Sequence, residues 1–245
     1  MRQKSVAKLY IAGLISISAL LLSLPFLLEH CGFLSLFGLV PLFLMEDIID
    51  REKLKRGGIY YYLYFVVWNG ITTYWIYHAT LPGAVAAVLL NSLQMWLVFW
   101  FYRLFKRKIA QKEGSNPHSF LPYLFFIVTW LGWEHYYFDA EVSWPWLVLG
   151  NAFAGSIKSI QWYEYTGTLG GSLWILLSNV LLYRILTYRG RGLREKVTLY
   201  SFYVILVVLP FVISAIMFHR YHEEKAPKEF VVIQPNIEPY QDKFT

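Results

Sequence analysis

The sequence predicts an all-α fold, a polytopic bundle of about seven transmembrane helices. Hydrophobic residues make up 57% of the 245 positions and charged residues only 16%, whereas soluble domains average about 45–50% and about 25%. Seven stretches also approach the roughly 20 apolar residues that a spanning helix needs. This apolar content excludes disorder, and the single cysteine, Cys31, excludes a disulfide scaffold. An integral membrane protein is the class that remains.

The apolar stretches follow one another along the whole chain. They are residues 8–28, 33–49, 58–78, 82–102, 119–138, 167–187 and 197–218. The second stretch is short and contains Pro41, so we expect a tilted or partial span there. The first is a retained helix rather than a signal peptide, because no cleavage site of small residues follows Leu27. The longest remaining segments, 139–166 and 219–245, are too short for an independent soluble domain.

Lysine and arginine gather on one side of the predicted bundle. Of the 22 basic residues, 17 fall in the N-terminus and around the ends of the second, fourth and sixth stretches. They are Arg2, Lys4, Lys8, Arg51, Lys53, Lys55, Arg56, Arg103, Lys106, Arg107, Lys108, Lys112, Arg184, Arg189, Arg191, Arg194 and Lys196. Basic residues favour the cytoplasmic side of short loops, so we expect a cytoplasmic N-terminus and a C-terminal tail outside. The net charge of +6 then reflects topology and attraction to anionic headgroups, and we expect no nucleic-acid partner.

The composition changes after the last stretch. Residues 219–228 are polar and charged, as in a linker, and Glu229–Gln234 is a β-branched run that ends at Pro235. A short run of this kind predicts a buried strand. A strand needs partners for its backbone groups. We therefore interpret 1–218 as a transmembrane domain and 219–245 as a linker with the start of a second domain.

The segment 139–166 is too apolar for an ordinary wet loop. Two tryptophans flank a proline there, at Trp144, Pro145 and Trp146. One interpretation is an aromatic belt at the membrane interface, where indole rings favour headgroup depth. The other is a re-entrant segment that lines a cavity for lipid. An aromatic belt also accounts for Trp75 and Tyr77 at the end of the third stretch.

Few side chains outside this segment suggest chemistry. Glu134 and His135 lie near membrane depth and are functional candidates, although both can simply reach the interface. His219 and His222 can share a helix face, but no further ligands are recognisable, so we expect no metal site. Cys31 lacks the base and orienting group that a nucleophile needs, and we interpret it as a structural thiol.

Four groups of residues occur in an informative order. They are Trp75-Ile76-Tyr77; Trp133-Glu134 with Ser143 to Leu147 and Gly150; Thr166-Gly167, Gly170-Gly171-Ser172 and Asn179; and Val232 to Ile237 with Lys243-Phe244. In this order and spacing they resemble the N-terminal membrane part of the apolipoprotein N-acyltransferases, bacterial enzymes that add a third acyl chain to lipoproteins. The last group resembles the first strand of that family's external nitrilase-like α/β domain. The resemblance covers the whole chain.

The resemblance implies acyl transfer outside the bacterial cytoplasmic (inner) membrane. In the family, a Glu-Lys-Cys triad in the nitrilase-like domain takes an acyl chain from a phospholipid as a thioester, and the N-terminal amine of a diacylated lipoprotein attacks it. Membrane phospholipids and a diacylated lipoprotein are therefore the expected partners, and no cofactor is expected. The triad lies beyond the first strand, and Cys31 does not match its nucleophile. We therefore expect this chain to be inactive by itself.

Three roles stay open. The first is the membrane portion of that acyltransferase, with an entrance for lipid lined by Trp75, Tyr77, Glu134, Trp144, Pro145 and Trp146. The second is a non-catalytic scaffold for a separately encoded enzyme. The third, a small transporter, is less favoured, because the centres of the stretches nearly lack the ionisable residues that transport pathways carry.

Overall fold

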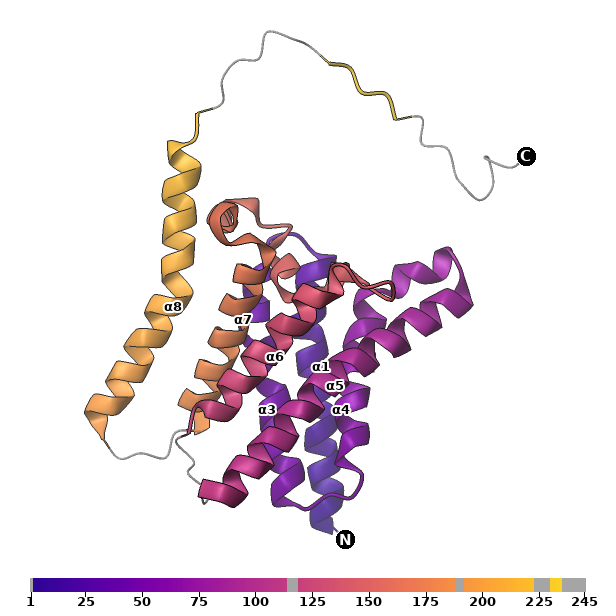
Figure 1. Ribbon diagram of the computed structural model, residues 1–245, viewed down its shortest axis with the longest axis vertical. Helices are drawn as coiled ribbons and strands as arrows, with labels where there is room; N and C mark the ends of the chain where they lie inside the picture. Colours follow the sequence, from indigo (N-terminus) through magenta and orange to yellow (C-terminus); the bar gives the residue numbers. More distant parts are fainter. Residues whose placement is uncertain (1, 114–118, 188–191, 223–229, 235–245) are drawn as a thin grey trace.

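The computed structural model describes residues 2–113, 119–187, 192–222 and 230–234 (Figure 1). Within these ranges all regular elements are helices, which confirms the all-α prediction. The α-helices are α1 (Arg2–Leu27), α2 (Ser35–Gly38), α3 (Val40–Arg51), α4 (Gly57–Thr72), α5 (Leu81–Glu113), α6 (Leu121–Tyr137), α7 (Tyr163–Thr187) and α8 (Leu193–Arg220). The 3-10 helices are η1 (Gly32–Leu34), η2 (Tyr74–His78), η3 (Pro145–Leu147), η4 (Leu149–Phe153) and η5 (Ile157–Ser159).

The helices occupy the seven stretches that the sequence predicts. In the described part of the chain, five of them are long and apolar enough to cross a membrane: α1, the continuous stretch from η1 to α3, α5, α7 and α8. The other two are shorter, with 16 residues in α4 and 17 in α6. The third stretch reaches His78 because η2 follows α4 after Thr73.

The second stretch is interrupted, as Pro41 predicts. Pro41 lies in the first turn of α3, and the helix breaks at Leu39. The backbone N–H groups of Leu39 and Val40 donate to Oδ1 of Asn179 on α7, at 2.7 and 3.1 Å. Nδ2 of Asn179 donates in turn to the carbonyl of Ser35, at 2.8 Å. A neighbouring helix thus supplies the hydrogen bonds that the broken helix lacks.

The core of the bundle is rich in aromatic side chains. Phe43 of α3 lies among Phe99, Tyr102, Phe126 and Tyr183, with ring centroids 5.2 to 6.4 Å apart. Aromatic rings prefer such edge-to-face and tilted contacts. These rings come from α5, α6 and α7, so the high aromatic content of the sequence serves in part to join four helices.

Helix α8 packs at one side of the bundle, next to α7 (Figure 1). Nε1 of Trp174 on α7 donates to the carbonyl of Leu206, at 2.8 Å. At its far end, the Lys158 ammonium in η5 lies 5.2 Å from the ring centroid of Phe218. Most apolar side chains of α8 are exposed, as expected of a helix that faces lipid.

Helix α5 is longer than the sequence predicts. The fourth stretch was expected to end at 102, but α5 continues to Glu113. Its additional residues are mostly good helix formers, and no helix breaker precedes Gly114. Arg103 and Lys106 therefore lie on a helix, whereas the sequence predicted a loop.

The predicted strand does not form in the described residues. Residues 230–234 have no regular secondary structure and are exposed. No described segment pairs with them, and an unpaired strand leaves its backbone groups unsatisfied. Glu229, and the residues from Pro235 to Phe244 that carry part of the family resemblance, lie outside the described residues. The second domain in 219–245 stays a prediction.

Candidate functional site

The segment between α6 and α7 folds back onto the bundle. Its three short 3-10 helices, η3 to η5, follow one another, and residues 147–150, 152 and 153 are buried. An ordinary wet loop is therefore excluded, in agreement with its apolar sequence. Non-helical backbone at membrane depth is tolerated only where protein or water covers it, so the contacts that hold this segment define the site.

Glu134 is the main anchor of this segment. Its side chain is fully buried, and Oε1 accepts hydrogen bonds from Nε1 of Trp130, at 2.9 Å, and from the backbone N–H of Leu149, at 2.8 Å. Oε2 has no hydrogen-bond partner among the described residues. The sequence left open whether Glu134 and His135 simply reach the membrane interface. In the structure, Glu134 is instead buried in the bundle, whereas His135 beside it is exposed.

A second anchor joins η4 to α7 through Gly150. Its backbone N–H donates to Oγ of Ser172, at 2.8 Å, and its carbonyl accepts from the hydroxyl of Tyr163, at 3.0 Å. A Cβ at this position would overlap the backbone carbonyl of Thr168. Only glycine allows η4 to approach α7 so closely.

Gly167 shapes the start of α7. Its φ of 63° and ψ of −172° interrupt the helix after a first turn at 163–166. Only glycine adopts this conformation at low cost. The break turns Tyr163 back toward η4, where its hydroxyl reaches Gly150. The glycine of the Thr166-Gly167 pair is thus required by the backbone conformation at the start of α7.

The anchors present a small group of indole rings, the aromatic rim, formed by Trp75, Trp144 and Trp146. The ring centroid of Trp75 lies 5.8 Å from that of Trp144 and 6.4 Å from that of Trp146. Trp75 is 43% and Trp146 is 64% exposed. Trp144 is half-buried, and its Nε1 has no hydrogen-bond partner in the described part of the chain.

The other predicted entrance residues lie around the rim in different ways. Tyr77 is exposed and lies beside His78, with the two rings tilted and their centroids 4.0 Å apart. Pro145 is half-buried, and its carbonyl accepts a hydrogen bond from Nδ2 of Asn151, at 2.9 Å. Glu134 lies behind the rim as a support. The structure thus brings together the three tryptophans and places Glu134 beneath the segment that carries two of them.

A polar network below the rim was missed by the sequence analysis. The hydroxyl of Tyr137 donates to Oδ1 of Asn91, at 2.6 Å, and Nδ2 of Asn91 donates to Oδ1 of Asn69, at 2.5 Å. This network joins α4, α5 and α6. Two amides inside apolar stretches were the signal available in the sequence, because buried polar groups in a membrane need partners.

The remaining candidates are not brought together into a site among the residues that the structure describes. His219 and His222 are exposed, and Glu223 and Glu224 lie outside the described residues. Among the described residues, no group of three or more His, Cys, Asp and Glu is placed to hold a metal ion. Cys31 is a free, half-buried thiol.

Long apolar helices, polar anchors buried between them and an indole rim at one end define a multi-pass membrane protein. Residues 18–181 match the family model described as the apolipoprotein N-acyltransferase N-terminal domain. The chain therefore belongs to this family, as the resemblance of its sequence predicted.

Two curated relatives agree with this assignment. The apolipoprotein N-acyltransferase of Chlorobaculum tepidum is 27% identical over 217 residues, which cover 86% of this chain and 38% of that protein. The protein of the same name from Geobacter metallireducens is 30% identical over 235 residues, which cover 91% of this chain and 42% of that protein. The chain thus spans about two fifths of the length of these curated relatives. No solved structure matches it.

Proposed function

We propose that the chain forms the membrane portion of an apolipoprotein N-acyltransferase. Such an enzyme moves an acyl chain from a phospholipid to the N-terminal cysteine amine of a diacylated lipoprotein. Family membership supports the reaction class, and the aromatic rim supports a role for this portion. In this proposal the rim admits lipid sideways to the catalytic domain.

The rim is the observation that carries this role. Two of its three indole rings, those of Trp75 and Trp146, are exposed although much of the surrounding segment is buried. Indole groups favour the depth of lipid headgroups, because one end of the ring is apolar and the other donates a hydrogen bond. Nε1 of Trp144 is buried without a hydrogen-bond partner among the described residues, and a phosphate or ester oxygen that entered between the rings would supply an acceptor. The anchors hold the rings in place, so little ordering is needed when lipid arrives.

The two ends of the bundle support an orientation for this proposal. The N-terminus and the α3–α4 connection lie at one end, and the 145–159 segment lies at the other (Figure 1). Basic residues favour the cytoplasmic side, so the rim faces the periplasm in the bacterial inner membrane. The contact between Lys158 and Phe218 shows that the chain leaves α8 at the same end as the rim. A catalytic domain that begins in 219–245 is thereby attached next to the lipid entrance.

In this proposal, the Glu-Lys-Cys triad lies in the nitrilase-like domain and not in the membrane portion. The single cysteine, Cys31, does not match the nucleophile of that triad, so we propose that residues 1–245 provide anchoring and lipid access. Transfer itself needs the nitrilase-like domain, either in the same polypeptide or as a separately encoded partner. Reading the gene beyond Thr245 separates these two arrangements.

The experiment uses the protein encoded by the complete open reading frame. N-acylation of a diacylated lipopeptide is measured while the phospholipid concentration is varied, for the wild type and for the double variant Trp75→Ala/Trp146→Ala. We expect the double variant to raise KM for phospholipid about tenfold, with kcat nearly unchanged, because the rim is proposed to bind lipid rather than to react.

Exposed aromatic residues elsewhere give a matched control. Tyr10→Ala on α1 and Phe202→Ala on α8 remove comparable exposed rings, and their KM is expected to stay at the wild-type value. An unchanged KM in the rim variant would remove the lipid entrance from the proposal. A wild-type protein that does not acylate, under conditions in which a relative does, would remove the acyltransferase assignment. Activity restored by a separate polypeptide would favour the scaffold instead.

A further inference from the structure

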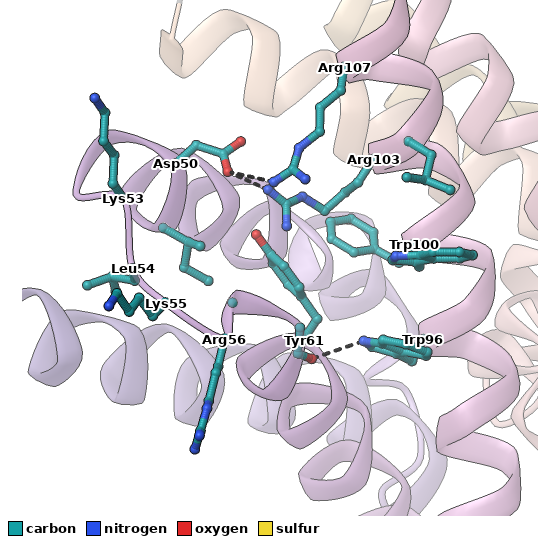
Figure 2. A pocket seen from close by; sticks show the side chains of 15 residues that line it. Asp50, Lys53, Leu54, Lys55, Arg56, Tyr61, Trp96, Trp100, Arg103 and Arg107 are labelled. Atoms are coloured by element: carbon teal, nitrogen blue, oxygen red, sulfur yellow. Dashed lines mark hydrogen bonds and ion pairs between the residues drawn. The ribbon is translucent and has the colours of Figure 1, made fainter.

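A hollow lies at the basic end of the bundle, opposite the aromatic rim. It has a volume of about 580 Å³. Its walls are the end of α3, the connection 53–56, the first turn of α4 and one face of α5 from Trp96 to Arg107 (Figure 2). The proposed acyl transfer uses none of these residues.

The lining of the hollow is strongly cationic. Five basic side chains and a single carboxylate, Asp50, line it. Asp50 forms ion pairs with both Arg103 and Arg107, the latter at 3.7 Å. The basic residues are Lys53, Lys55, Arg56, Arg103 and Arg107.

Three of these cations are not neutralised. Lys53, Lys55 and Arg56 form no ion pair with any described residue. Figure 2 shows them extending from the connection at the edge of the hollow, Lys53 and Arg56 in opposite directions. Their long side chains are free to turn toward an anion.

A buried hydroxyl without a partner points into the same hollow. Tyr61 is only 2% exposed, and its hydroxyl has no hydrogen-bond partner among the described residues. The guanidinium carbon of Arg103 lies 4.6 Å from the centroid of its ring. Figure 2 shows the hydroxyl end pointing toward the Arg103–Asp50 pair. A buried donor without an acceptor is unfavourable, and a ligand oxygen would satisfy it.

The N-terminus of α4 adds backbone N–H donors, which attract anions, to the cationic side chains of the hollow. Arg56 at its N-cap has a left-handed φ of 61°, and no side chain caps the helix. The first N–H groups of a helix have no intrahelical acceptors and attract anions. A Cβ built on Gly57 would lie 4.0 Å from a guanidinium nitrogen of Arg103. The helix end and the guanidinium group therefore converge on one place.

The face of α5 gives the hollow an apolar side. Trp96 and Trp100 stack, with ring centroids 6.2 Å apart, and Trp100 is 41% exposed. Leu104 follows on the same helix and is also exposed. An apolar wall that continues from a cationic one suits an amphiphile, whereas a soluble anion would gain nothing from it.

We propose that this hollow binds the headgroup phosphate of an anionic phospholipid, with its acyl chains along Trp100 and Leu104. Tyr61, Arg103 and the first turn of α4 contact the phosphate, and the cations of the connection close over it. The lipid belongs to the leaflet opposite the aromatic rim and is a bound structural partner, not the acyl donor. That the leaflet is cytoplasmic rests on the orientation proposed above; the binding itself does not.

Native mass spectrometry of the complete protein in detergent tests the site. The protein is titrated with dioleoylphosphatidylglycerol, with zwitterionic dioleoylphosphatidylethanolamine and, in a separate arm, with inorganic phosphate. We expect retention of one phosphatidylglycerol at concentrations about tenfold below those needed for phosphatidylethanolamine, and no competition by millimolar phosphate. Saturable binding of free phosphate with no preference for the lipid would overturn the lipid assignment.

Two variants address the hollow itself. Tyr61→Phe removes only the unpartnered hydroxyl and is expected to weaken phosphatidylglycerol binding about tenfold. Lys53→Gln/Lys55→Gln/Arg56→Gln removes three exposed cations and is expected to weaken it about tenfold or more. Without lipid, the melting temperature is expected to stay unchanged for the triple variant and to be equal or slightly higher for Tyr61→Phe, because that hydroxyl is buried there without an acceptor.

The control variant, Lys108→Gln/Arg194→Gln/Lys196→Gln, loses the same charge from the same end of the bundle but outside the hollow. It is expected to retain the wild-type affinity. Equal losses in the control and the test variant would show nonspecific attraction to a charged surface, and wild-type affinity in Tyr61→Phe would remove the hydroxyl from the site. Because acyl transfer is not measured, failure here leaves the proposed function untouched.

Discussion

At the scale of single residues, polar side chains hold this bundle together where apolar packing alone cannot. Glu134 carries the 145–150 segment through Trp130 and Leu149, and Asn179 completes the broken helix at Leu39. In both cases one buried side chain accepts hydrogen bonds from backbone N–H groups that have no helical acceptor. Such groups are costly to leave unpaired.

The role of Glu134 as an anchor makes a sharp prediction. Glu134→Gln keeps an oxygen that can accept both hydrogen bonds, so we expect its free energy of unfolding to stay within about 1 kcal/mol of wild type. Glu134→Ala leaves two buried donors without an acceptor and is expected to lower it by about 2–4 kcal/mol. Unfolding by SDS in mixed micelles measures both values.

Glu141→Gln, on the exposed part of the same segment, is the control and should be neutral. A glutamine variant as unstable as the alanine variant would show that the charge of Glu134, rather than its hydrogen bonds, is required. The acylation assay of the glutamine variant adds a separate reading, because a purely structural anchor leaves KM and kcat unchanged.

At the scale of elements, the segment between α6 and α7 is shaped by glycine as much as by tryptophan. Gly150 lets η4 contact α7, and Gly167 breaks α7 so that Tyr163 can reach back to Gly150. The aromatic rim is therefore the exposed part of a segment that packs against α7, and its geometry depends on these two glycines.

The backbone of Gly167 can be tested by a matched pair of substitutions. A Cβ on Gly167 or on Gly132 of α6 would meet no atom within 4 Å, so the two sites differ in conformation rather than in space. Gly167→Ala is expected to lower the free energy of unfolding by about 1–3 kcal/mol, because its φ of 63° and ψ of −172° are unfavourable for alanine. Gly132→Ala lies within a helix and is expected to be neutral or to gain up to about 1 kcal/mol. Equal melting temperatures for the two variants would contradict the assigned break.

At the scale of the whole molecule, the two ends of the bundle are chemically different. One end carries the aromatic rim and the exit from α8, and the other carries the N-terminus and the cationic hollow (Figure 1). A core rich in aromatic residues joins them. This polarity suits a protein whose two ends face two different compartments.

The proposed orientation predicts which end a reagent outside the cell can reach. In a Cys31→Ser background, a membrane-impermeant maleimide should label Glu141→Cys in intact cells. It should label Lys108→Cys only after lysis. Both residues are exposed in the structure, so the membrane is the barrier that separates them. The reverse pattern would invert the orientation and remove the periplasmic assignment of the rim.

Local sequence was sufficient for the helical class, for the places of the seven stretches, for the interruption at Pro41 and for the concentration of basic residues at one end. These features depend on composition and on residues near one another in the chain, such as a proline inside an apolar run. The end of α5 was misplaced because a change from apolar to basic residues marks the limit of an apolar stretch and not the end of a helix. The strand at 230–234 was expected from local β-propensity, but a strand forms only with a partner.

Contacts between distant residues were beyond the reach of the sequence. Trp75 contacts Trp144 and Trp146 only because η2, which follows α4, and the segment between α6 and α7 lie at the same end of the bundle. Glu134 is buried because that segment folds over it, and Arg103 of α5 forms an ion pair with Asp50 of α3 although 53 residues separate them. The chain's apolar surface drives it into the membrane as helices, but which polar groups face one another there depends on how the helices pack.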